Sequence, residues 1–176
     1  VELPFGTIWL YLSGMKKSDT LTIRAYIPSD KEEVLTLHRL AMEAIGVSGH
    51  EPHWNEELDT IETTYGEGRG VFLIGTVGDK IVAMGAYKKT GQDEAEIRRM
   101  RGLPGHQKKG FGKRIYAELE KRAVESGIRR FFLKTSVLQD NAKDLYRASG
   151  FKETGQVVID GYDCIVYEKK LIIEKK

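Results

Sequence analysis

The fold is decided by a stretch that begins with Glu94-Ala95-Glu96-Ile97-Arg98-Arg99-Met100-Arg101-Gly102-Leu103 and continues with Pro104-Gly105-His106-Gln107-Lys108-Lys109-Gly110-Phe111-Gly112. The first part is strand-like, whereas the second is rich in glycine and lysine. From Gly110 onward the apolar residues recur at helical spacing, at Phe111, Ile115, Leu119 and Ala123. The stretch therefore predicts a strand, a glycine turn and an amphipathic helix.

The sequence before the glycine turn predicts strands and two helices. The strands are expected at Leu21–Arg24, Val71–Val77, Ile81–Tyr87 and Glu94–Leu103. One helix begins at Ser29 or Asp30, and a second runs from about Asn55 to Thr64. Between the helices, Gly46–His53 is rich in breakers and polar residues, so we expect a surface loop there. Short turns separate the last three strands, which predicts an antiparallel meander.

The sequence after the long helix predicts a strand, a short helix and a hairpin. These elements are expected at Arg130–Thr135, from Asp140 or Asn141 to Gly150, and at about Glu153–Ile159 and Tyr162–Leu171. Asp160-Gly161 is the strongest hairpin signal in the chain. With a strand–helix–strand unit between two meanders, we expect an α/β fold: a mixed, mostly antiparallel central sheet of about six to seven strands flanked by about four helices.

Length and charge favour one soluble domain. The 176 residues can bury a sizeable core, and 28 basic against 26 acidic residues leave a net charge of only +2. We expect the domain over residues 20–176, with residues 1–19 as an extension or alternative start, because Met15 resembles a natural start. The apolar run Ile8–Leu12 is too short to span a bilayer. The single cysteine, Cys164, is expected to be buried in a reducing compartment, the cytoplasm.

The glycine turn suits a phosphate or pyrophosphate. Glycines let several backbone N–H groups converge, and the first helical turn adds unpaired N–H groups and its positive dipole end. A P-loop is excluded, because Gly105 and Gly110 have the right spacing but Phe111 and Gly112 follow where lysine and serine or threonine are needed. A dinucleotide fingerprint is also excluded, since Ile115 stands where a third glycine is required.

Two segments together resemble the GNAT superfamily of N-acetyltransferases. Glu96-Ile97 through Gly102-Leu103-Pro104 to the glycine turn is similar to the coenzyme A segment of that family. Ala142, then Leu145-Tyr146, then Gly150-Phe151 is similar to its second hallmark helix and strand. The resemblance covers nearly all of the chain from Leu21 onward. It implies transfer of an acetyl group from acetyl-CoA to a primary amine of a small molecule, peptide or protein, by direct attack in a ternary complex.

The resemblance also implies the cofactor site. Its residues would be Met100, Arg101, Gly102, Gln107, Lys108, Lys109, Gly110, Phe111, Gly112, Lys113, Gln139, Ala142 and Tyr146. The chain departs from the usual pattern at Gly102, where valine is common, at Arg101, where a bulky residue is common, and at Gln139, where asparagine is frequent. A glycine inside a strand often marks a bulge or a close backbone approach, and Gly102 fits a strand that splays to admit the pantetheine arm.

Three residues are candidates for the chemistry. Glu96 matches the general base of some family members, and the alternative is a solvated glutamate paired with Arg98. The backbone N–H of Met100 is the expected oxyanion donor, while its side chain is expected in the core. Tyr146 matches the family's catalytic tyrosine and would protonate the departing thiolate; the alternative is a tyrosine that only packs its helix.

The histidines and the basic residues of the chain bear on other functions. The histidines His38, His50, His53 and His106 have no metal spacing, so we expect no metal. A nucleic-acid binder could use the basic residues Arg98, Arg99, Arg101, Lys108, Lys109, Lys113 and Arg114, but they lack interleaved aromatic residues apart from Phe111. A non-catalytic acyl-CoA-binding module stays open. The expected partner is the amine substrate, without nucleic acid or membrane, and a homodimer is compatible with these expectations.

Overall fold

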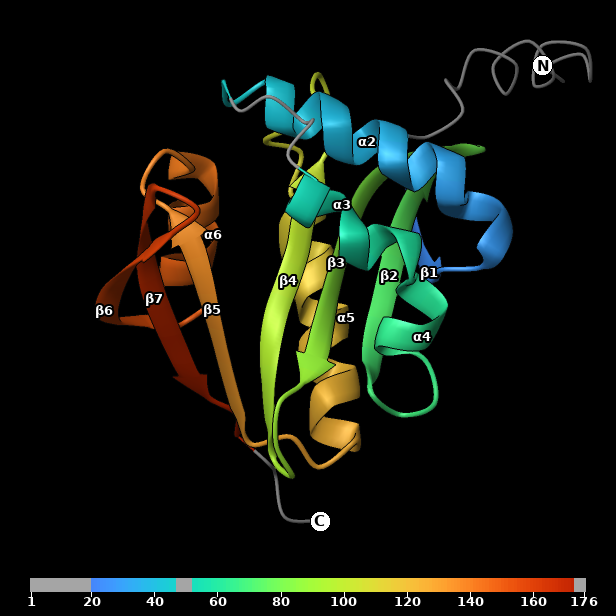
Figure 1. Ribbon diagram of the computed structural model, residues 1–176. Coiled ribbons are helices and arrows are strands. Elements are labelled where there is room, and N and C mark those ends of the chain that lie inside the picture. Colours follow the sequence, from blue (N-terminus) through green and yellow to red (C-terminus); the bar gives the residue numbers. More distant parts are fainter. Residues whose placement is uncertain (1–19, 47–51, 173–176) are drawn as a thin grey trace, which may run out of the picture.

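The computed structural model describes residues 20–46 and 52–172 (Figure 1). The expectations for residues 1–19 and for His50 concern residues outside this part. The strands are β1 (Leu21–Ala25), β2 (Gly70–Val77), β3 (Lys80–Lys89), β4 (Glu94–Gly102), β5 (Arg130–Ser136), β6 (Lys152–Ile159) and β7 (Tyr162–Lys170). The helices are the 3₁₀ turn η1 (Pro28–Asp30), then α2 (Lys31–Glu43), α3 (Pro52–Asp59), α4 (Ile61–Tyr65), α5 (Phe111–Glu125) and α6 (Asp140–Ala148).

The described strands form one seven-stranded sheet in the order β1-β2-β3-β4-β5-β7-β6. Every neighbouring pair is antiparallel except β4 and β5, which are parallel and joined through α5. In Figure 1, α5 lies behind the sheet, whereas α2, α3 and α4 lie in front of it. The mixed, mostly antiparallel sheet expected from the sequence is therefore confirmed.

The core follows the periodicity of the sequence. The predicted apolar face of α5 is buried, and Ile115, Leu119 and Ala123 are fully so. They pack against the middle of the sheet, where Leu73 of β2 and Met84 of β3 are also buried. Both faces of β2 and β3 are covered by helices, which explains why these strands read as continuous apolar runs rather than alternating ones.

Two helical expectations were wrong. The loop expected over Gly46–His53 ends early, because α3 already begins at Pro52. Proline is favoured at the first helical position, where its missing N–H is not needed. The single helix expected from Asn55 to Thr64 is instead divided at Thr60, whose backbone leaves helical geometry (φ −125°, ψ 35°) and whose hydroxyl donates to the Glu56 carbonyl at 3.2 Å. Five α-helices therefore occupy the described residues, against about four expected.

Candidate functional site

Strands β4 and β5 form a wedge. They pair only through Glu94 with Arg130, Ala95 with Phe131 and Glu96 with Phe132. Toward the top of Figure 1 the two strands separate, where α2 crosses the sheet. We call Glu94–Glu96 the closed end of β4 and Ile97–Gly102 its open end. Along the open end β4 pairs with β3 alone, so its other edge presents backbone N–H and C=O groups that β5 does not satisfy.

A cleft of about 560 Å³ lies at the open end. It is lined by Ala41, Met42 and Ile45 at the end of α2; Met100, Arg101 and Gly102 of β4; His106, Gln107, Lys108 and Gly110 of the glycine turn; Phe111, Gly112 and Lys113 of α5; and Leu138, Gln139, Asp140, Asn141, Ala142 and Leu145 in and before α6. The cleft therefore joins the two segments that suggested a common site in the sequence.

A β-bulge shapes the open end. Arg98 pairs with Ala86 and Arg101 with Met84, so Arg99 and Met100 together stand opposite Gly85. Arg99 adopts the left-handed conformation (φ +55°), which costs a residue with a side chain about 1–2 kcal/mol. Gly85 makes the bulge sterically possible, because a Cβ there would lie 2.4 Å from the Met100 sulfur and 2.7 Å from Cγ2 of Ile115 on α5.

The alternative that Gly102 itself marks a bulge is wrong. Gly102 pairs in register with Ala83, and the irregularity falls at Arg99 and Met100 instead. The steric requirement lies on the neighbouring strand, at Gly85, which the sequence of β4 cannot reveal. Gly102 does line the cleft, and a Cβ there would find only Cγ of Gln107, at 4.0 Å. Its absent side chain thus leaves room for a close approach to the backbone.

The glycine turn ends in an uncapped helix. Gly105, Lys108 and Gly110 all have positive φ, at 85°, 60° and 76°. When residues in the left-handed conformation alternate with residues in other conformations, successive backbone N–H groups turn toward one side and form a concave anion-binding site. Gly110 precedes α5, where no side chain caps the helix and no acidic residue occupies the first turn. The first N–H groups of α5 are therefore available to an anion.

An ion-pair network runs over the α3 side of β4. Glu57 of α3 pairs with Arg98 and, at 3.0 Å, with Arg99. Arg98 also donates to Glu96, with its Nε at 2.8 Å from Oε2, and Lys134 of β5 lies 3.8 Å from the other Glu96 oxygen. Burial alone would raise the pKa of Glu57, but the charges of Arg99 and Arg98 outweigh it and lower that pKa. The pairing of Glu96 with Arg98 is confirmed, whereas the expectation of a solvated side chain is wrong, because Glu96 is 8% exposed.

Three side chains around the open end carry buried nitrogens without hydrogen-bond partners: Nε of Arg101, Nδ1 of His106 and both ring nitrogens of His38 of α2. His38 is buried as a whole, whereas Arg101 and His106 are partly exposed. Burial and the charges of Arg101 and Arg99 lower the pKa of His38 to about 3, so the imidazole is neutral at physiological pH. Burial and the charge of Arg99 lower the pKa of Arg101 to about 10, so Arg101 remains charged. Unpartnered buried polar groups are rare and call for an explanation.

Tyr146 lies behind the cleft rather than in its wall. Its ring is 5% exposed and packs against Phe151 and Tyr167, with centroids 5.6 and 6.1 Å away. Burial raises the pKa of its phenol to about 12, and the charge of Arg101 acts in the opposite direction. Tyr146 therefore has the contacts of a core residue and a charged neighbour that lines the cleft.

Most of the predicted cofactor residues meet in the cleft. The predicted cofactor residues that line it are Met100, Arg101, Gly102, Gln107, Lys108, Gly110, Phe111, Gly112, Lys113, Gln139 and Ala142. Two predicted cofactor residues, Lys109 and Tyr146, do not line the cleft, and neither does Glu96, the predicted general base. Sequence reasoning missed the end of α2, whose Ala41 and Met42 read as ordinary core positions. It also missed Asn141, whose amide lies two residues beyond Gln139 and in the same cleft.

Three arginines of the basic cluster considered for nucleic acid are engaged within the molecule. Arg98 and Arg99 are paired with Glu57, and Arg114 donates to the Leu21 carbonyl at 3.0 Å.

Within residues 20–46 and 52–172, no three His, Cys, Asp or Glu side chains converge as metal ligands. No helix in the described part of the chain is both long and apolar enough to cross a bilayer.

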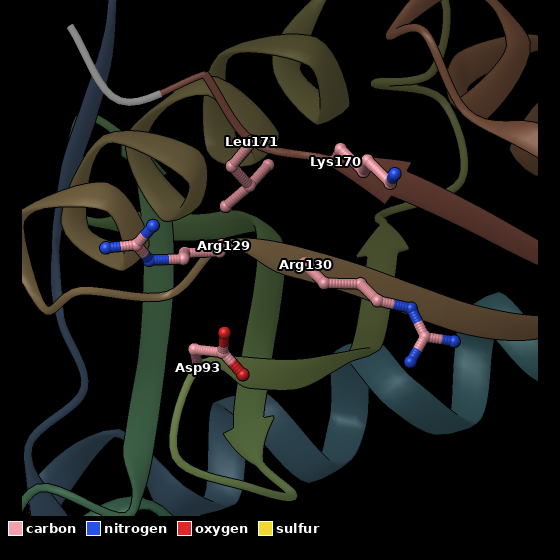
Figure 2. Close-up of a pocket in the computed structure, with 5 residues that line it drawn as sticks. All are labelled: Asp93, Arg129, Arg130, Lys170 and Leu171. Atoms are coloured by element: carbon pink, nitrogen blue, oxygen red, sulfur yellow. The ribbon is translucent and has the colours of Figure 1, made fainter.

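A second pocket, of about 410 Å³, lies at the closed end of the sheet (Figure 2). It is lined by Asp93, Arg129, Arg130, Lys170 and Leu171. Figure 2 shows the side chains of Arg129 and Arg130 pointing away from each other. Arg130 is occupied by ion pairs with Glu94 and Glu168, and the Asp93 carbonyl accepts two backbone N–H bonds, from Arg129 and Arg130. Two of the groups at this pocket, the Arg130 side chain and the Asp93 carbonyl, are therefore engaged within the protein.

Comparison with known proteins places these features in context. A family model described as the acetyltransferase (GNAT) family matches residues 32–151. An acetyltransferase of the GNAT family from Staphylococcus aureus Mu50 has a TM-score of 0.79 at 19% identity, covering 87% of this chain and all of that chain. PaiA N-acetyltransferase from Thermoplasma acidophilum, solved in complex with coenzyme A, has a TM-score of 0.73 at 21% identity, over 86% and 99% of the two chains.

A third similar structure is the ribosomal-protein-S18-alanine N-acetyltransferase from Escherichia coli, with a TM-score of 0.70 at 20% identity over 89% and 97% of the chains. At these identities the structural likeness shows the fold. A search among curated proteins finds no significant match.

Proposed function

The chain belongs to the acetyltransferase (GNAT) family, whose members transfer an acetyl group from acetyl-CoA to an amine, and we propose that the cleft at the open end of β4 is its active site. The observation that carries the proposal is the continuity between the unpaired edge of β4 and the uncapped start of α5. An extended arm can hydrogen-bond to such an edge, and a phosphate group can bind such a helix start.

The residues present fit coenzyme A. The uncapped N–H groups of α5, with Lys108 and Lys113 beside them, suit the pyrophosphate. A Cβ at Gly110 would meet no atom within 4 Å, so the turn leaves open space there. Gly102, Gln139, Asn141 and Ala142 line the path along β4 that we assign to the pantetheine arm. We assign no direct contact to Lys109, which does not line the cleft.

The bound cofactor supplies an acetyl group activated as a thioester. We propose that the acceptor amine attacks directly in a ternary complex and that the backbone N–H of Met100 stabilises the oxyanion. The bulge supports this role, because two residues of β4 oppose one of β3 and one of them lacks a regular ladder partner. A donor fixed by the bulge needs no reorganisation as the charge develops.

Glu96 is the proposed acceptor of the amine proton. It does not line the cleft, and one of its carboxylate oxygens is occupied by Arg98. Transfer therefore runs through water to the other oxygen, whose charged neighbour is Lys134 at 3.8 Å. Glu96→Gln should lower kcat by about tenfold to a hundredfold. An unchanged kcat would assign Glu96 to the ion-pair network alone.

Calorimetry and thiol release test the proposal as a whole. Acetyl-CoA should bind with about micromolar affinity, and Lys113→Met should weaken binding by about fivefold, an effect that shrinks at high salt. An amine panel scored by release of free coenzyme A should then find an acceptor. Binding without transfer to any amine would support the non-catalytic module instead, and failure to bind coenzyme A would contradict the site.

We also propose a cytoplasmic location, where acetyl-CoA is available and the buried thiol of Cys164 stays reduced.

We propose a homodimer that forms through β6, because β6 is an edge strand and carries exposed apolar side chains, of which Val158 is 64% exposed. Light scattering across a dilution series measures the mass, and a monomer at every concentration would contradict the dimer.

A further inference from the structure

The three arginines at the open end of β4 differ in their partners. Glu57 accepts from both Arg98 and Arg99, so these two charges are compensated within the protein. Arg101 has no ion pair with any carboxylate of the described residues, and one of its terminal nitrogens donates to the Met100 carbonyl at 2.9 Å. Its Nε is buried without a partner. Arg101 is thus a charged cleft residue with an unused donor.

Arg101 lies on the α2 side of the sheet. The Met100 side chain faces α5, since its sulfur would contact a Cβ placed at Gly85 together with Ile115. Successive side chains of a strand alternate between faces, so Arg101 faces the opposite side, where its charge acts on His38 of α2. Its charge also acts on Tyr146, across the wedge. The guanidinium is therefore placed near the region where acceptor, acetyl group and Tyr146 must meet.

No described neighbour supplies the missing negative charge. His38 is neutral, and Asp140, the one acidic residue among those that line the cleft, is paired with Lys143 at 2.7 Å. A partly buried charge without an opposite charge nearby costs free energy, and a ligand that brings the opposite charge relieves that cost. The pyrophosphate of the cofactor is already matched by the glycine turn with Lys108 and Lys113. A negative charge on the other substrate would match Arg101.

We propose that Arg101 binds a carboxylate of the acceptor, which is therefore a small amine bearing a carboxylate, of the free amino acid class. The inference rests on the proposed function. A guanidinium with Nε free presents a fork that matches the two oxygens of a carboxylate. Polyamines are disfavoured by the same arrangement, because the charged side chains of the cleft other than Asp140 are Arg101, Lys108 and Lys113.

The test compares L-amino acids with their carboxamides at saturating acetyl-CoA, with spermidine as the cationic control. For at least one pair, kcat/KM should be about tenfold higher for the acid, and Arg101→Met should bring the ratio close to one. The amide has the more readily deprotonated amine, so amine basicity would favour the opposite result. Arg101→Lys should retain part of the preference. Arg122→Met is the control, since Arg122 pairs with Glu118 on α5.

A binding measurement separates this inference from the proposed function. Arg101 also lines the cleft assigned to the cofactor, so its loss should weaken amino-acid binding much more than coenzyme A binding. Calorimetry of the preferred amino acid with the protein saturated by coenzyme A should show binding that Arg101→Met abolishes, and an equal loss of coenzyme A affinity would overturn the inference. Equal use of acids and amides, preference for spermidine, or transfer to neither member of any pair overturns the inference and leaves the cofactor site standing. A different acyl donor provides one more outcome. If kcat/KM is about tenfold higher with succinyl-CoA than with acetyl-CoA, and only when Arg101 is present, the inference is also overturned, because the carboxylate then belongs to the acyl group.

Discussion

The two ends of β4 belong to one strand but have different surroundings. At the closed end, Glu94–Glu96 pairs with strands on both sides and its neighbours form ordinary ion pairs. At the open end, Ile97–Gly102 keeps one partner strand, bulges opposite Gly85 and lies beside buried nitrogens without partners. Unsatisfied groups and a strained residue, Arg99, therefore concentrate where the cleft lies. The difference supports the proposal that the substrates meet at the open end, while the closed end joins the two parts of the sheet and places Glu96 at the boundary between them.

The largest effect should come from Tyr146→Phe. If the phenol protonates the departing thiolate, kcat should fall by about a hundredfold or more, while the ring still packs against Phe151 and Tyr167. Steady-state thiol release and calorimetry with acetyl-CoA measure turnover and binding separately. Unchanged turnover would make Tyr146 a core residue and would weaken the assignment of chemistry to the open end.

Glu57→Gln tests the compensation of Arg98 and Arg99. Removing the carboxylate should lower the free energy of unfolding by about 1–3 kcal/mol near neutral pH, because two partly buried arginines lose their charged acceptor. Since the pKa of Glu57 is lowered in the folded protein, its contribution is fully present above its ordinary value near 4.5 and is lost as the pH falls through the folded value. Urea unfolding from pH 7 to pH 3 should therefore show the gap between the two proteins narrowing below about pH 4.5. A difference in unfolding free energy that does not change with pH would contradict the ion-pair network of Glu57.

Gly85→Ala should damage the bulge. The new Cβ would meet the Met100 sulfur and Ile115, and overpacking of this kind costs about 1–3 kcal/mol. We expect a lower Tm together with a lower kcat, since the same shift moves the Met100 N–H. Gly155→Ala in β6 is the matched control, because a Cβ there meets nothing within 4 Å. Equal melting temperatures for the two variants would show that Gly85 does not set the bulge.

The smallest effect should follow Arg130→Met at the closed end. Arg130 pairs with Glu94 and Glu168, but its side chain is 43% exposed, and exposed pairs contribute about 0–1 kcal/mol. Methionine keeps the packing over Phe132, so Tm should drop slightly and kcat/KM should stay unchanged. A loss of activity without a loss of stability would break the division between the two ends.

Much of the fold was predictable because its signals are local. The turn at Asp160-Gly161 has both residues at positive φ, as its sequence indicates, and the apolar face of α5 is buried as its period requires. The division at Thr60 and the helix start at Pro52 were missed, because either residue fits a loop as well as a helix end.

The site was predictable only in part. The glycine turn and Gln139 reach the cleft, since their roles depend on residues close in sequence. The bulge depends on Gly85 in the neighbouring strand, and the unpaired state of Arg101 depends on where Glu57 points. Contacts between distant segments of this kind leave no local pattern, so they could not be read from β4 itself.

The short pairing between β4 and β5 has a consequence for hydrogen exchange. Three residue pairs, between Glu94–Glu96 and Arg130–Phe132, connect the sheet of β1 to β4 with that of β5 to β7. Amide protons on the free edge of Ile97–Gly102 have no strand to protect them, so they should exchange with deuterium sooner than those of β2 and β3. A ligand lying in the wedge would replace the absent strand, and the slowing of exchange along this edge would trace its path.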